Sequence, residues 1–520
     1  MMVRHIGDAL VRTSAGPRCH HAAIVDGSRR VTYAELLERA LSRAALLTNR
    51  GVRKGDRVVI FLPRSFEAVV ALFATWFAGG VAVIANEHLR AMQVRHIIDH
   101  SECSLVVTNT RQILAVGRLP YEQVMNIDQI DPPAEGSPAA PIIVGADLAL
   151  LIYTSGSTGL PKGVMLSHDN LLSGADIVSS YLRLTERDVI LSVLPFSFDY
   201  GLNQLLTAVF VGATLVLQRS PFPPDICRTL EREQITGLAG VPTLWLQLTG
   251  KQSPFLKTEL PHLRYITNSG GRLPEGTVKL IREAHPHTQI YLMYGLTEAF
   301  RSTYLPPDEV DRRPASMGKA IPNVEVLVLD DDGRRCAPGE VGELVHRGAN
   351  VALGYWRDPE TTARVFRPHP LHDWRNGRHE VVVFSGDLVT LDAEGYLYFV
   401  GRRDKLIKSR GVRVSPEEIE ACVHTSGLIS QVVSFAVARD GGDANVIVAV
   451  VPSDPQAFST ELLEEFCKNE MPEYMRPHQI WRLDAVPLTS SGKPDRGRIQ
   501  QLYVEQHQIT GTAARAARTA

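Results

Sequence analysis

The chain has 520 residues, enough for more than two ordinary domains, and its 44% hydrophobic and 22% charged residues are typical of a folded globular protein. The formal net charge of −2 gives no overall field that would favour nucleic acid or an anionic membrane, so we expect neither partner. The six cysteines are scattered without a C-x-x-C pair, which argues against a zinc ribbon or a disulfide framework. Because the amino-terminal segment also lacks a signal-peptide core, we expect a cytoplasmic protein.

Strands and helices alternate in the amino-terminal part of the chain, which predicts a parallel sheet with helices on both faces. In chain order we expect a strand (29–33), a helix (34–50), a strand (56–62), an apolar helix, the strand VAVI (81–84), a helix (91–100) and a strand (104–109). Residues 68–85 are almost wholly apolar and long enough to suggest a membrane span. Gly79-Gly80 divides them, however, and we interpret the stretch as a buried helix leading into a buried strand.

The remaining chain changes character twice. Residues 131–141, DPPAEGSPAAP, have the composition of a linker, and a second alternating series runs from Leu148 to about Leu305. After residue 320, short strands separated by D-D-G and A-E-G turns predict a β-rich subdomain, and from Arg413 a helix, two strands and a helix predict a small α+β domain.

We therefore predict an α/β fold with four successive parts. These are a large domain (1–401) of two parallel-type α/β subdomains plus the β-rich subdomain, a hinge (402–405), a small mobile α+β domain (406–505) and a disordered tail (506–520).

Residues 153–168, YTSGSTGLPKGVMLSH, contain an unbroken run of hydroxyl residues and glycines followed by a lysine. We expect a strand at 148–153 before this loop and a helix at 167–180 after it, so that backbone N–H groups near the helix start suit an anion. The order G-x-x-x-x-G-K-[ST] is absent because Gly163 follows Lys162, which argues against a P-loop kinase or motor. The candidate phosphate-binding residues are Thr154, Ser155, Gly156, Ser157, Thr158, Gly159 and Lys162.

Five segments taken together resemble the AMP-forming adenylating ligases, the superfamily of acyl-CoA synthetases, luciferases and peptide-synthetase adenylation domains. They are TSGSTGLPKG (154–163), YGLTEA (294–299), SGDLV (385–389), GRRDKLIKSRGVRVSPEEIE (401–420) and PLTSSGKPDR (487–496). The resemblance implies that ATP activates a small carboxylic acid as an acyl-adenylate with release of pyrophosphate, and that a thiol then displaces AMP.

The resemblance assigns the loop at 154–163 to the β- and γ-phosphates, so that it holds the leaving pyrophosphate. It assigns Glu298 to a magnesium ion, Thr297 to the α-phosphate and Tyr294 to the adenine. Magnesium and ATP are thus the implied cofactors, and Thr297 and Glu298 are counted among the catalytic residues.

The later motifs supply the remaining nucleotide contacts and the moving parts. Asp387 is expected to accept the ribose hydroxyls, Arg402 to contact the ribose or the phosphates, and Arg413 to contact the phosphates or the thioester-forming state. Lys493 is expected to bridge the attacking carboxylate and the α-phosphate as the main catalytic residue. Asp404 falls at the hinge that would let one site serve two half-reactions.

The acyl pocket is expected around residues 194–206, LPFSFDYGLNQLL. Phe198-Asp199 matches a pair found in peptide-synthetase adenylation domains, where the aspartate binds the substrate ammonium, and Asn203, Asn268 and Arg301 fall at other pocket positions. Because this lining is polar, and because Arg301 could take a second carboxylate or another polar group, we favour a polar or amino acid. In the alternative, a fatty or aryl acid, Asp199 would only cap the following helix and Arg301 would face water.

Two other functions compete with an acid–thiol ligase. A catalytically inactive nucleotide-binding regulator is disfavoured because both Glu298 and Lys493 are present, whereas a luciferase-like oxygenase shares the same motifs and stays open. The segment after residue 505 is too short for a carrier domain, so we expect the acceptor thiol on coenzyme A or on the phosphopantetheine of a separate carrier protein.

Overall fold

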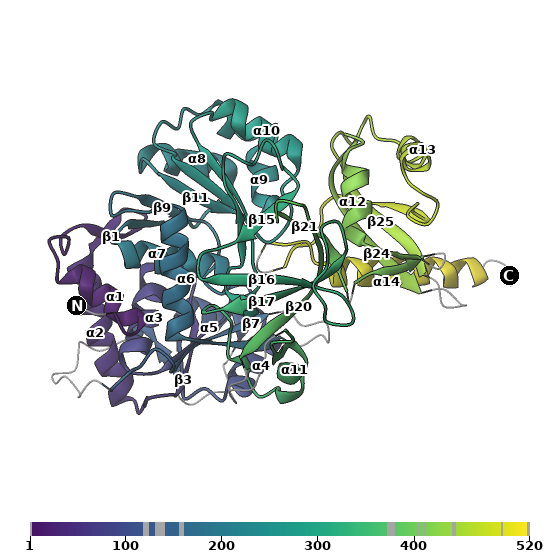
Figure 1. Cartoon of the computed structure of the whole chain (residues 1–520). Coiled ribbons are helices and arrows are strands. Elements are labelled where there is room, and N and C mark those ends of the chain that lie inside the picture. Colours follow the sequence, from purple (N-terminus) through teal and green to yellow (C-terminus); the bar gives the residue numbers. More distant parts are fainter. Residues whose placement is uncertain are drawn as a thin grey trace. The chain divides into compact units, whose positions relative to one another are not determined.

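The computed structural model describes residues 3–117, 124–129, 141–154, 161–371, 380–403, 405–409, 412–438, 444–489 and 492–516. The chain forms two compact units, the large unit (Met1–Leu327 and Val345–Ser385) and the small unit (Val328–Leu344 and Gly386–Ala520) (Figure 1). The predicted linker lies outside the described residues except for Pro141, and so does Asp404 of the predicted hinge. The domain boundaries drawn from the sequence therefore stay predictions.

One sheet of the large unit runs in the order β15-β14-β13-β12-β11-β9-β10-β1-β2. Neighbours from β13 to β1 are parallel, whereas β2, β14 and β15 join antiparallel. The strands are β1 (Ala22–Asp26), β2 (Arg29–Thr32), β9 (Val189–Ser192), β10 (Thr214–Leu217), β11 (Gly237–Gly240), β12 (Tyr265–Asn268), β13 (Gln289–Tyr294), β14 (Thr303–Leu305) and β15 (Ser316–Ala320).

A second sheet of the large unit runs in the order β18-β8-β7-β4-β3-β5-β6. Its strands are β3 (Arg57–Phe61), β4 (Val81–Ile84), β5 (Leu105–Thr108), β6 (Val124–Asn126), β7 (Leu148–Thr154), β8 (Lys162–Ser167) and β18 (Gly354–Tyr355). Neighbours from β7 to β6 are parallel, which confirms the predicted parallel α/β series. The strand expected at 29–33 is not part of this series, because β2 pairs with β1 in the other sheet.

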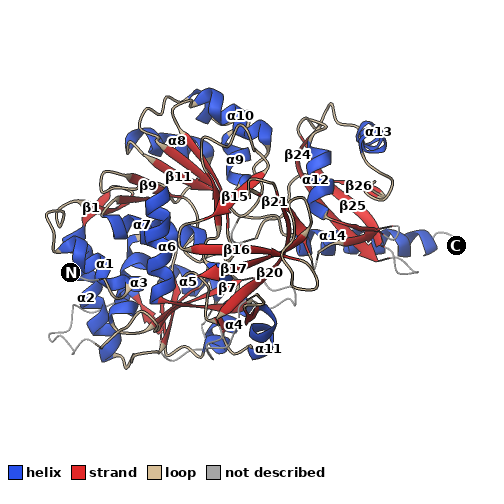
Figure 2. Ribbon diagram, in the orientation of Figure 1, coloured by secondary structure: helices blue, strands red, loops and turns tan. Residues whose placement is uncertain are grey.

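Helices cover both sheets (Figure 2), as the alternating pattern predicts. They are α1 (Ile6–Ser14), α2 (Tyr33–Asn49), α3 (Phe66–Phe77), α4 (Ala91–Ser101), α5 (Thr110–Val116), α6 (His168–Tyr181), α7 (Asp199–Val211), α8 (Pro223–Arg232), α9 (Pro242–Leu248), α10 (Glu275–Ala284) and α11 (Pro359–Val365). Short 3-10 helices in the described residues are η1 (Ile127–Gln129), η2 (Phe255–Lys257) and η3 (Thr297–Ala299). Helix α2 packs on α3, α6 on α7 and α1 on α7, and their apolar faces form the main core with the strands.

The apolar stretch at 68–85 divides as expected. Helix α3 is 12 residues long and ends at Phe77, and Gly79 then adopts φ +74°, a left-handed conformation that suits glycine. The buried strand β4 follows directly. Within the described ranges, no helix combines the length and the apolar character needed to cross a membrane.

The β-rich segment contains β16 (Val324–Leu329), β17 (Gly342–Gly348), β19 (Phe366–Pro368), β20 (Val381–Leu391) and β21 (Leu397–Arg402), which confirms the strands predicted there. Both predicted turns need their glycine. Gly333 and Gly395 have φ values of +77° and +82°, and each donates its backbone N–H three residues back, to Asp330 and Asp392.

The small unit contains a three-stranded sheet covered by helices. Its elements are β22 (Ile407–Ser409), β23 (Val412–Val414), α12 (Pro416–His424), β24 (Ile429–Ala438), β25 (Ala444–Pro452), α13 (Thr460–Glu470), β26 (Gln479–Arg482) and α14 (Arg496–Ala516). Alternate residues of β25 face opposite sides: Val446 and Val448 pack in the cluster with α12 and α13, and Ile447 packs in the cluster with α14. We expected residues 506–520 to be disordered, whereas α14 continues to Ala516.

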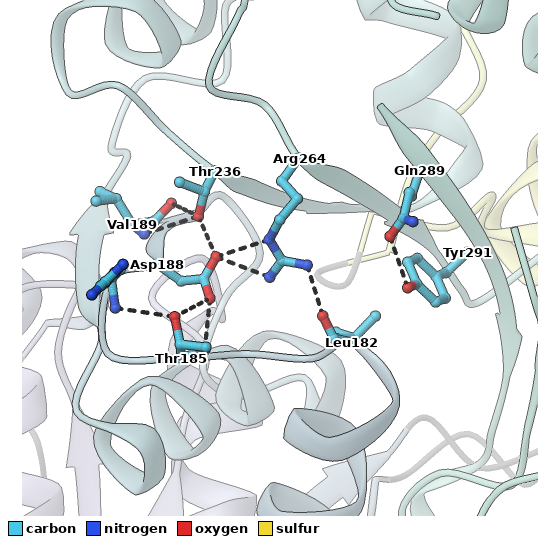
Figure 3. Close-up of polar contacts among 9 residues, drawn as sticks. Leu182, Thr185, Asp188, Val189, Thr236, Arg264, Gln289 and Tyr291 are labelled. Atoms are coloured by element: carbon cyan, nitrogen blue, oxygen red, sulfur yellow. Dashed lines mark hydrogen bonds and ion pairs between the residues drawn. The ribbon is translucent and has the colours of Figure 1, made fainter. Parts of the chain in front are cut away.

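A buried carboxylate joins three segments of the first sheet (Figure 3). Asp188 accepts from Arg264 through Nη2 at 2.9 Å and Nε at 3.3 Å, from Thr236 Oγ1 at 2.7 Å and from the backbone N–H of Thr185 at 2.7 Å. Arg264 Nη1 donates to the Leu182 carbonyl at 2.9 Å. All three nitrogens of the Arg264 guanidinium therefore donate hydrogen bonds, and the network fixes the start of β9 against β11 and β12.

Replacing Asp188 by alanine should destabilise the large unit by about 3 kcal/mol, because Thr236 and Arg264 would lose their shared acceptor. Thermal unfolding measures this effect as a fall of several degrees in the midpoint. The matched control is Glu275→Ala, which removes the exposed 2.8 Å pair with Arg272 and should change stability by less than about 1 kcal/mol. Equal shifts in the two variants would contradict the structural role of Asp188.

Candidate active site

The predicted phosphate loop connects two antiparallel strands. Strand β7 ends at Thr154, β8 begins at Lys162, and these two residues are paired in the ladder. Helix α6 begins only at His168, where the Ser167 hydroxyl accepts from the Asn170 backbone N–H at 3.2 Å. The helix predicted at 167–180 is therefore confirmed to within one residue at each end, but strand β8, which the sequence analysis does not predict, separates it from the loop. The loop residues Ser155, Gly156, Ser157, Thr158 and Gly159 lie outside the described residues.

The ammonium of Lys162 is fixed at the start of α11. It donates to Asp358 Oδ2 at 2.8 Å and to Thr361 Oγ1 at 2.7 Å. Asp358 also caps α11 by accepting from the Thr361 backbone N–H at 2.9 Å, and the nearby ammonium lowers the pKa of this carboxyl to about 2. Sequence reasoning missed Asp358 and Thr361, although the order D-P-E-T marks a capped helix start.

Glu298 lies in η3 and is held by the segment that contains β18. The Tyr355 hydroxyl donates to Glu298 Oε1 at 2.5 Å, and the Ala352 backbone N–H donates to the Glu298 carbonyl at 2.8 Å. The Lys162 ammonium lies 6.0 Å from the centre of the Tyr355 ring. Two predicted motifs far apart in the sequence, 154–163 and 294–299, thus meet at Tyr355, which sequence reasoning also missed.

Tyr294 ends β13 and its ring stacks on that of His346 in β17, with centroids 6.1 Å apart and planes at 19°. His346 is fully buried, and burial lowers the pKa of its imidazole to about 3. Within the part of the chain that the structure describes, neither ring nitrogen has a hydrogen-bond partner. The ring is therefore neutral at pH 7 and supports the tyrosine predicted to lie near the adenine.

The two residues predicted to contact the ribose lie together in the small unit. Asp387 and Arg402 are opposite each other in the β20–β21 ladder, with Nε and Oδ1 3.4 Å apart. Gly386 adopts φ +71°, and its carbonyl accepts from the Arg403 backbone N–H at 2.7 Å. Arg413 lies on β23 with its side chain outside the described residues.

Lys493 closes a turn of the small unit. Its carbonyl accepts from the Thr489 backbone N–H at 2.7 Å, and its own N–H donates to Thr489 Oγ1 at 3.2 Å. The side chain is half-buried. This placement in a turn fits the loop position predicted for Lys493, and its catalytic role stays a prediction.

The predicted acyl-pocket residues gather around a buried ion pair in the large unit. Asp199 Oδ2 lies 3.5 Å from Arg301 Nη1, and only 5% and 3% of the two side chains are exposed. The N-cap of α7 is Phe198, so Asp199 is the first helical residue and not the cap that the alternative assumed. Arg301 does not face water, because its guanidinium lies 4.6 Å over the Tyr200 ring. Asn203 follows one turn after Asp199 and is fully buried.

The other two pocket candidates are Phe198, the N-cap of α7, and Asn268 in β12. Phe198 packs edge-on against Tyr200, with ring centroids 6.1 Å apart. Asn268 ends β12, where its Nδ2 donates to the Gly271 carbonyl at 2.9 Å. Tyr200 was not among the predicted residues, because an aromatic residue inside an apolar helix carries no signal beyond core packing.

The chain combines two units with a fixed lysine ammonium, a hydrogen-bonded glutamate and a buried Asp–Arg pair, and its motifs resemble those of adenylating ligases. Comparison with family models agrees: the model described as AMP-binding enzyme matches residues 11–356, and that described as AMP-binding enzyme C-terminal domain matches residues 418–493. The chain belongs to the family of AMP-binding enzymes, which confirms the resemblance inferred from the motifs.

Individual relatives come from two kinds of protein. A linear gramicidin synthase of Brevibacillus parabrevis is 31% identical over 480 residues, which cover 91% of this chain but 9% of the synthase. The o-succinylbenzoate CoA synthetase of Bacillus subtilis, solved with its acyl-adenylate, is 26% identical with a TM-score of 0.82, over 94% of this chain and 97% of that one. An anthranilate CoA ligase shares the fold at 23% identity and a TM-score of 0.85, over 96% and 98% of the two chains. The chain thus spans less than a tenth of the gramicidin synthase and nearly the whole of the CoA ligases.

The buried imidazole of His346 predicts a pH-dependent stability. Its pKa is about 3 in the folded chain and about 6.5 when unfolded, so below pH 6.5 the unfolded state binds the extra proton and stability falls. Between pH 7 and pH 5, the free energy of unfolding should therefore fall by about 2 kcal/mol less in His346→Leu than in the wild type. Thermal unfolding at both pH values measures the effect. The exposed His20 provides the control, since His20→Gln should leave the pH dependence unchanged, and an unchanged dependence in His346→Leu would contradict the assignment.

Proposed function

We propose that this chain is an acid–thiol ligase that forms an acyl-adenylate from ATP and a small polar carboxylic acid. The observation that carries the proposal is the meeting of two motifs at Tyr355, which binds Glu298 at 2.5 Å and lies beside the Lys162 ammonium. Glu298 and Lys162 come from two separate predicted motifs, and each lies against the same tyrosine. Their meeting suits a site where a polyanion and a divalent cation bind together.

In the first half-reaction, a carboxylate oxygen of the acid attacks the α-phosphorus of ATP, and the bond from this phosphorus to the bridging oxygen of the β-phosphate breaks. Pyrophosphate is the leaving group. In the second half-reaction, a thiolate attacks the acyl carbon, the bond between that carbon and the phosphate oxygen breaks, and AMP leaves. Both steps need positive charge near oxygens that become more negative.

Lys162 is suited to the leaving pyrophosphate. An ammonium has three N–H donors, and Asp358 and Thr361 accept two of them at 2.8 and 2.7 Å, so among the described residues the third is left for a phosphate oxygen. The two fixed contacts orient the ammonium before ATP arrives, which lowers the entropic cost of that contact. In this proposal the loop residues 154–159 supply the remaining phosphate contacts.

Glu298 is the residue that would hold magnesium, which would supply charge neutralisation on the phosphates when bound. A single carboxylate fits this ion, because magnesium commonly takes one or two protein carboxylates together with phosphate oxygens and waters. The Tyr355 hydrogen bond occupies Oε1 of Glu298 and would orient the carboxylate that holds the ion. The related o-succinylbenzoate CoA synthetase has been solved with ATP and a magnesium ion, which supports the proposal that this chain also binds both.

The acceptor would be a thiol of the phosphopantetheine type. The CoA synthetase among the structural neighbours supports coenzyme A, and the gramicidin synthase relative supports a carrier protein, two acceptors that present the same thiol arm. Asp387 and Arg402 would bind the ribose, Thr297 the α-phosphate and Tyr294 the adenine, while Arg413 and the hinge residue Asp404 would act in the later thioester-forming state.

Lys493→Ala should abolish adenylate formation but largely spare thioester formation from a supplied acyl-adenylate. The charge of this lysine is needed only when the carboxylate meets the phosphate, and the loss of such a contact costs on the order of a hundred- to a thousand-fold in rate. Pyrophosphate exchange measures the first half-reaction, and thioester release from synthetic adenylate measures the second. An equal loss in both would show that Lys493 does not have this role.

Tyr355→Phe should raise the magnesium concentration needed for half-maximal pyrophosphate exchange by roughly ten-fold, because Glu298 loses the donor that orients it. The apolar ring is retained, so thermal stability should change by less than about 1.5 kcal/mol. Tyr398→Phe removes a comparable hydroxyl bond to Asp392 at 3.2 Å and is the control. A Tyr355→Phe enzyme with an unchanged magnesium requirement would argue against Glu298 as the magnesium ligand.

A further inference from the structure

Arg301, one of the predicted acyl-pocket residues, has a hydrogen-bonding edge without a partner among the described residues. Among the residues that the structure describes, its Nε and Nη2 atoms have no hydrogen-bond partner, although only 3% of the side chain is exposed. Nε and Nη2 lie on the same side of the guanidinium, which is the edge that grips a carboxylate with two parallel hydrogen bonds. Buried donors without partners are costly, so such an edge points to a ligand.

Arg264 shows what a structural arginine looks like in the same fold. Its Nε and Nη2 both donate to Asp188, and its Nη1 donates to a backbone carbonyl (Figure 3). Arg301 reverses this arrangement, because Asp199 lies 3.5 Å from Nη1 and leaves the two-atom edge open. The ion pair with Asp199 therefore compensates the charge of Arg301 without occupying the edge that recognises a carboxylate.

The backbone and ring contacts of Arg301 hold the edge in place. Its φ of +98° is unusual for a residue with a side chain, and such strain persists only where surrounding contacts fix it. Asn350 supplies one such contact by donating to the Arg301 and Ala299 carbonyls. The guanidinium lies 4.6 Å over the ring of Tyr200, whose hydroxyl is in turn hydrogen-bonded to Thr267. The guanidinium is thus pre-oriented, which reduces the entropic cost of binding a ligand.

Asn203 adds a second unsatisfied group in the same pocket. Within the described parts of the chain, neither its Nδ2 nor its Oδ1 has a partner, and the residue is fully buried. A Cβ built on Gly174 would lie 2.5 Å from the Phe300 ring and 3.5 Å from Asn203 Nδ2, so the bare glycine lets the ring sit beside this amide. Asn203 lies one helical turn after Asp199, the partner of Arg301, so its buried amide is a second donor group on that face of α7.

We propose, on the basis of the proposed ligase function, that the acid activated by this chain is a short dicarboxylic acid. One carboxylate is adenylated, and the other binds the Nε–Nη2 edge of Arg301 with Asn203 as an additional donor. A simple amino acid fits less well, because its ammonium would approach Asp199 with the Arg301 cation already 3.5 Å away. An alkyl chain fits least, since it would leave the donors of Arg301 and the amide of Asn203 buried without partners.

The first test is pyrophosphate exchange with malonate, succinate, glutarate, aspartate and glutamate. The comparison acids are monomethyl succinate, butyrate, octanoate, benzoate, alanine and ornithine. We expect kcat/KM for at least one dicarboxylate to exceed that for every comparison acid by roughly a thousand-fold or more, because a site built to bind a charged group rejects analogues that lack it. Monomethyl succinate is the sharpest comparison, since it keeps the size of a dicarboxylic acid and loses one charge.

Two variants then locate the recognition. Arg301→Lys keeps the positive charge beside Asp199 but loses the two-atom edge, and it should lower kcat/KM for the preferred dicarboxylate by roughly a hundred-fold while sparing exchange with its monomethyl ester. Asn203→Leu should lower it by roughly ten-fold. Arg264→Lys is the matched control, because it alters a satisfied arginine and should lower thermal stability without changing the ratio of dicarboxylate to ester.

The outcomes separate this inference from the proposed function. Efficient exchange with monocarboxylates or simple amino acids, and none with dicarboxylates, would overturn the dicarboxylate proposal and leave the ligase function intact. A wild-type preference for dicarboxylates that survives in Arg301→Lys would overturn the role of Arg301. No exchange with any of these acids in the presence of ATP and magnesium would count against both proposals.

Discussion

The segment Ala349–Tyr355 is the constraint on which the candidate site depends. Asn350 donates to carbonyls on either side of Phe300, the Ala352 backbone N–H donates to the Glu298 carbonyl, and Tyr355 donates to the Glu298 carboxylate. The segment is fixed from the other side by Asn170 of α6, whose Nδ2 donates to the Ala349 and Val351 carbonyls at 2.8 and 2.9 Å. These bonds hold η3 and the residues after it in one conformation.

The same segment positions the proposed magnesium ligand and the proposed substrate-binding arginine. Glu298 and Arg301 are separated by two residues, and the same clamp holds both, so the proposed magnesium ligand and the proposed substrate ligand are placed by one set of hydrogen bonds. The strained φ of +98° at Arg301 is then a consequence of turning the chain sharply enough to bring both side chains into the site. The clamp would also keep the acid in register with the phosphates, which is how positioning contributes to rate.

The sequence predicts the elements well where their pattern is local. The strand VAVI has the predicted bounds and the helix predicted at 91–100 ends one residue later, because buried parallel strands and amphipathic helices carry their own periodicity. Two features of the fold are not predicted from the sequence, because long-range strand pairing decides them. Strand β8 is concealed next to a run of glycines and hydroxyls, and β2 joins the other sheet by pairing with β1. Nothing within either segment encodes its partner.

The candidate site divides in the same way. Lys162, Glu298, Asp387 and Arg402 could be named from motifs, whereas Tyr355 and Asp358, which contact two of them, lie in a stretch with no motif of its own. The pairing of Asp199 with Arg301 could not be foreseen either, because 102 residues separate them in the chain.

The pairing of Asp199 with Arg301 changes which charged group the proposed pocket would bind. A buried aspartate without a partner favours a bound cation, so the sequence alone suggests that Asp199 binds the ammonium of an amino acid. Because Arg301 lies beside it, the negative charge of Asp199 is already compensated. Among the described residues, the atoms without partners are instead the donors of Arg301 and the amide of Asn203. Such a site would be selective because an acid without a second acceptor leaves these buried donors without hydrogen-bond partners. This penalty discriminates between acids more strongly than an apolar pocket discriminates by size. In the proposed pocket, the residue types alone predict a polar substrate, and only the pairing of Asp199 with Arg301 predicts that its second charged group is an anion.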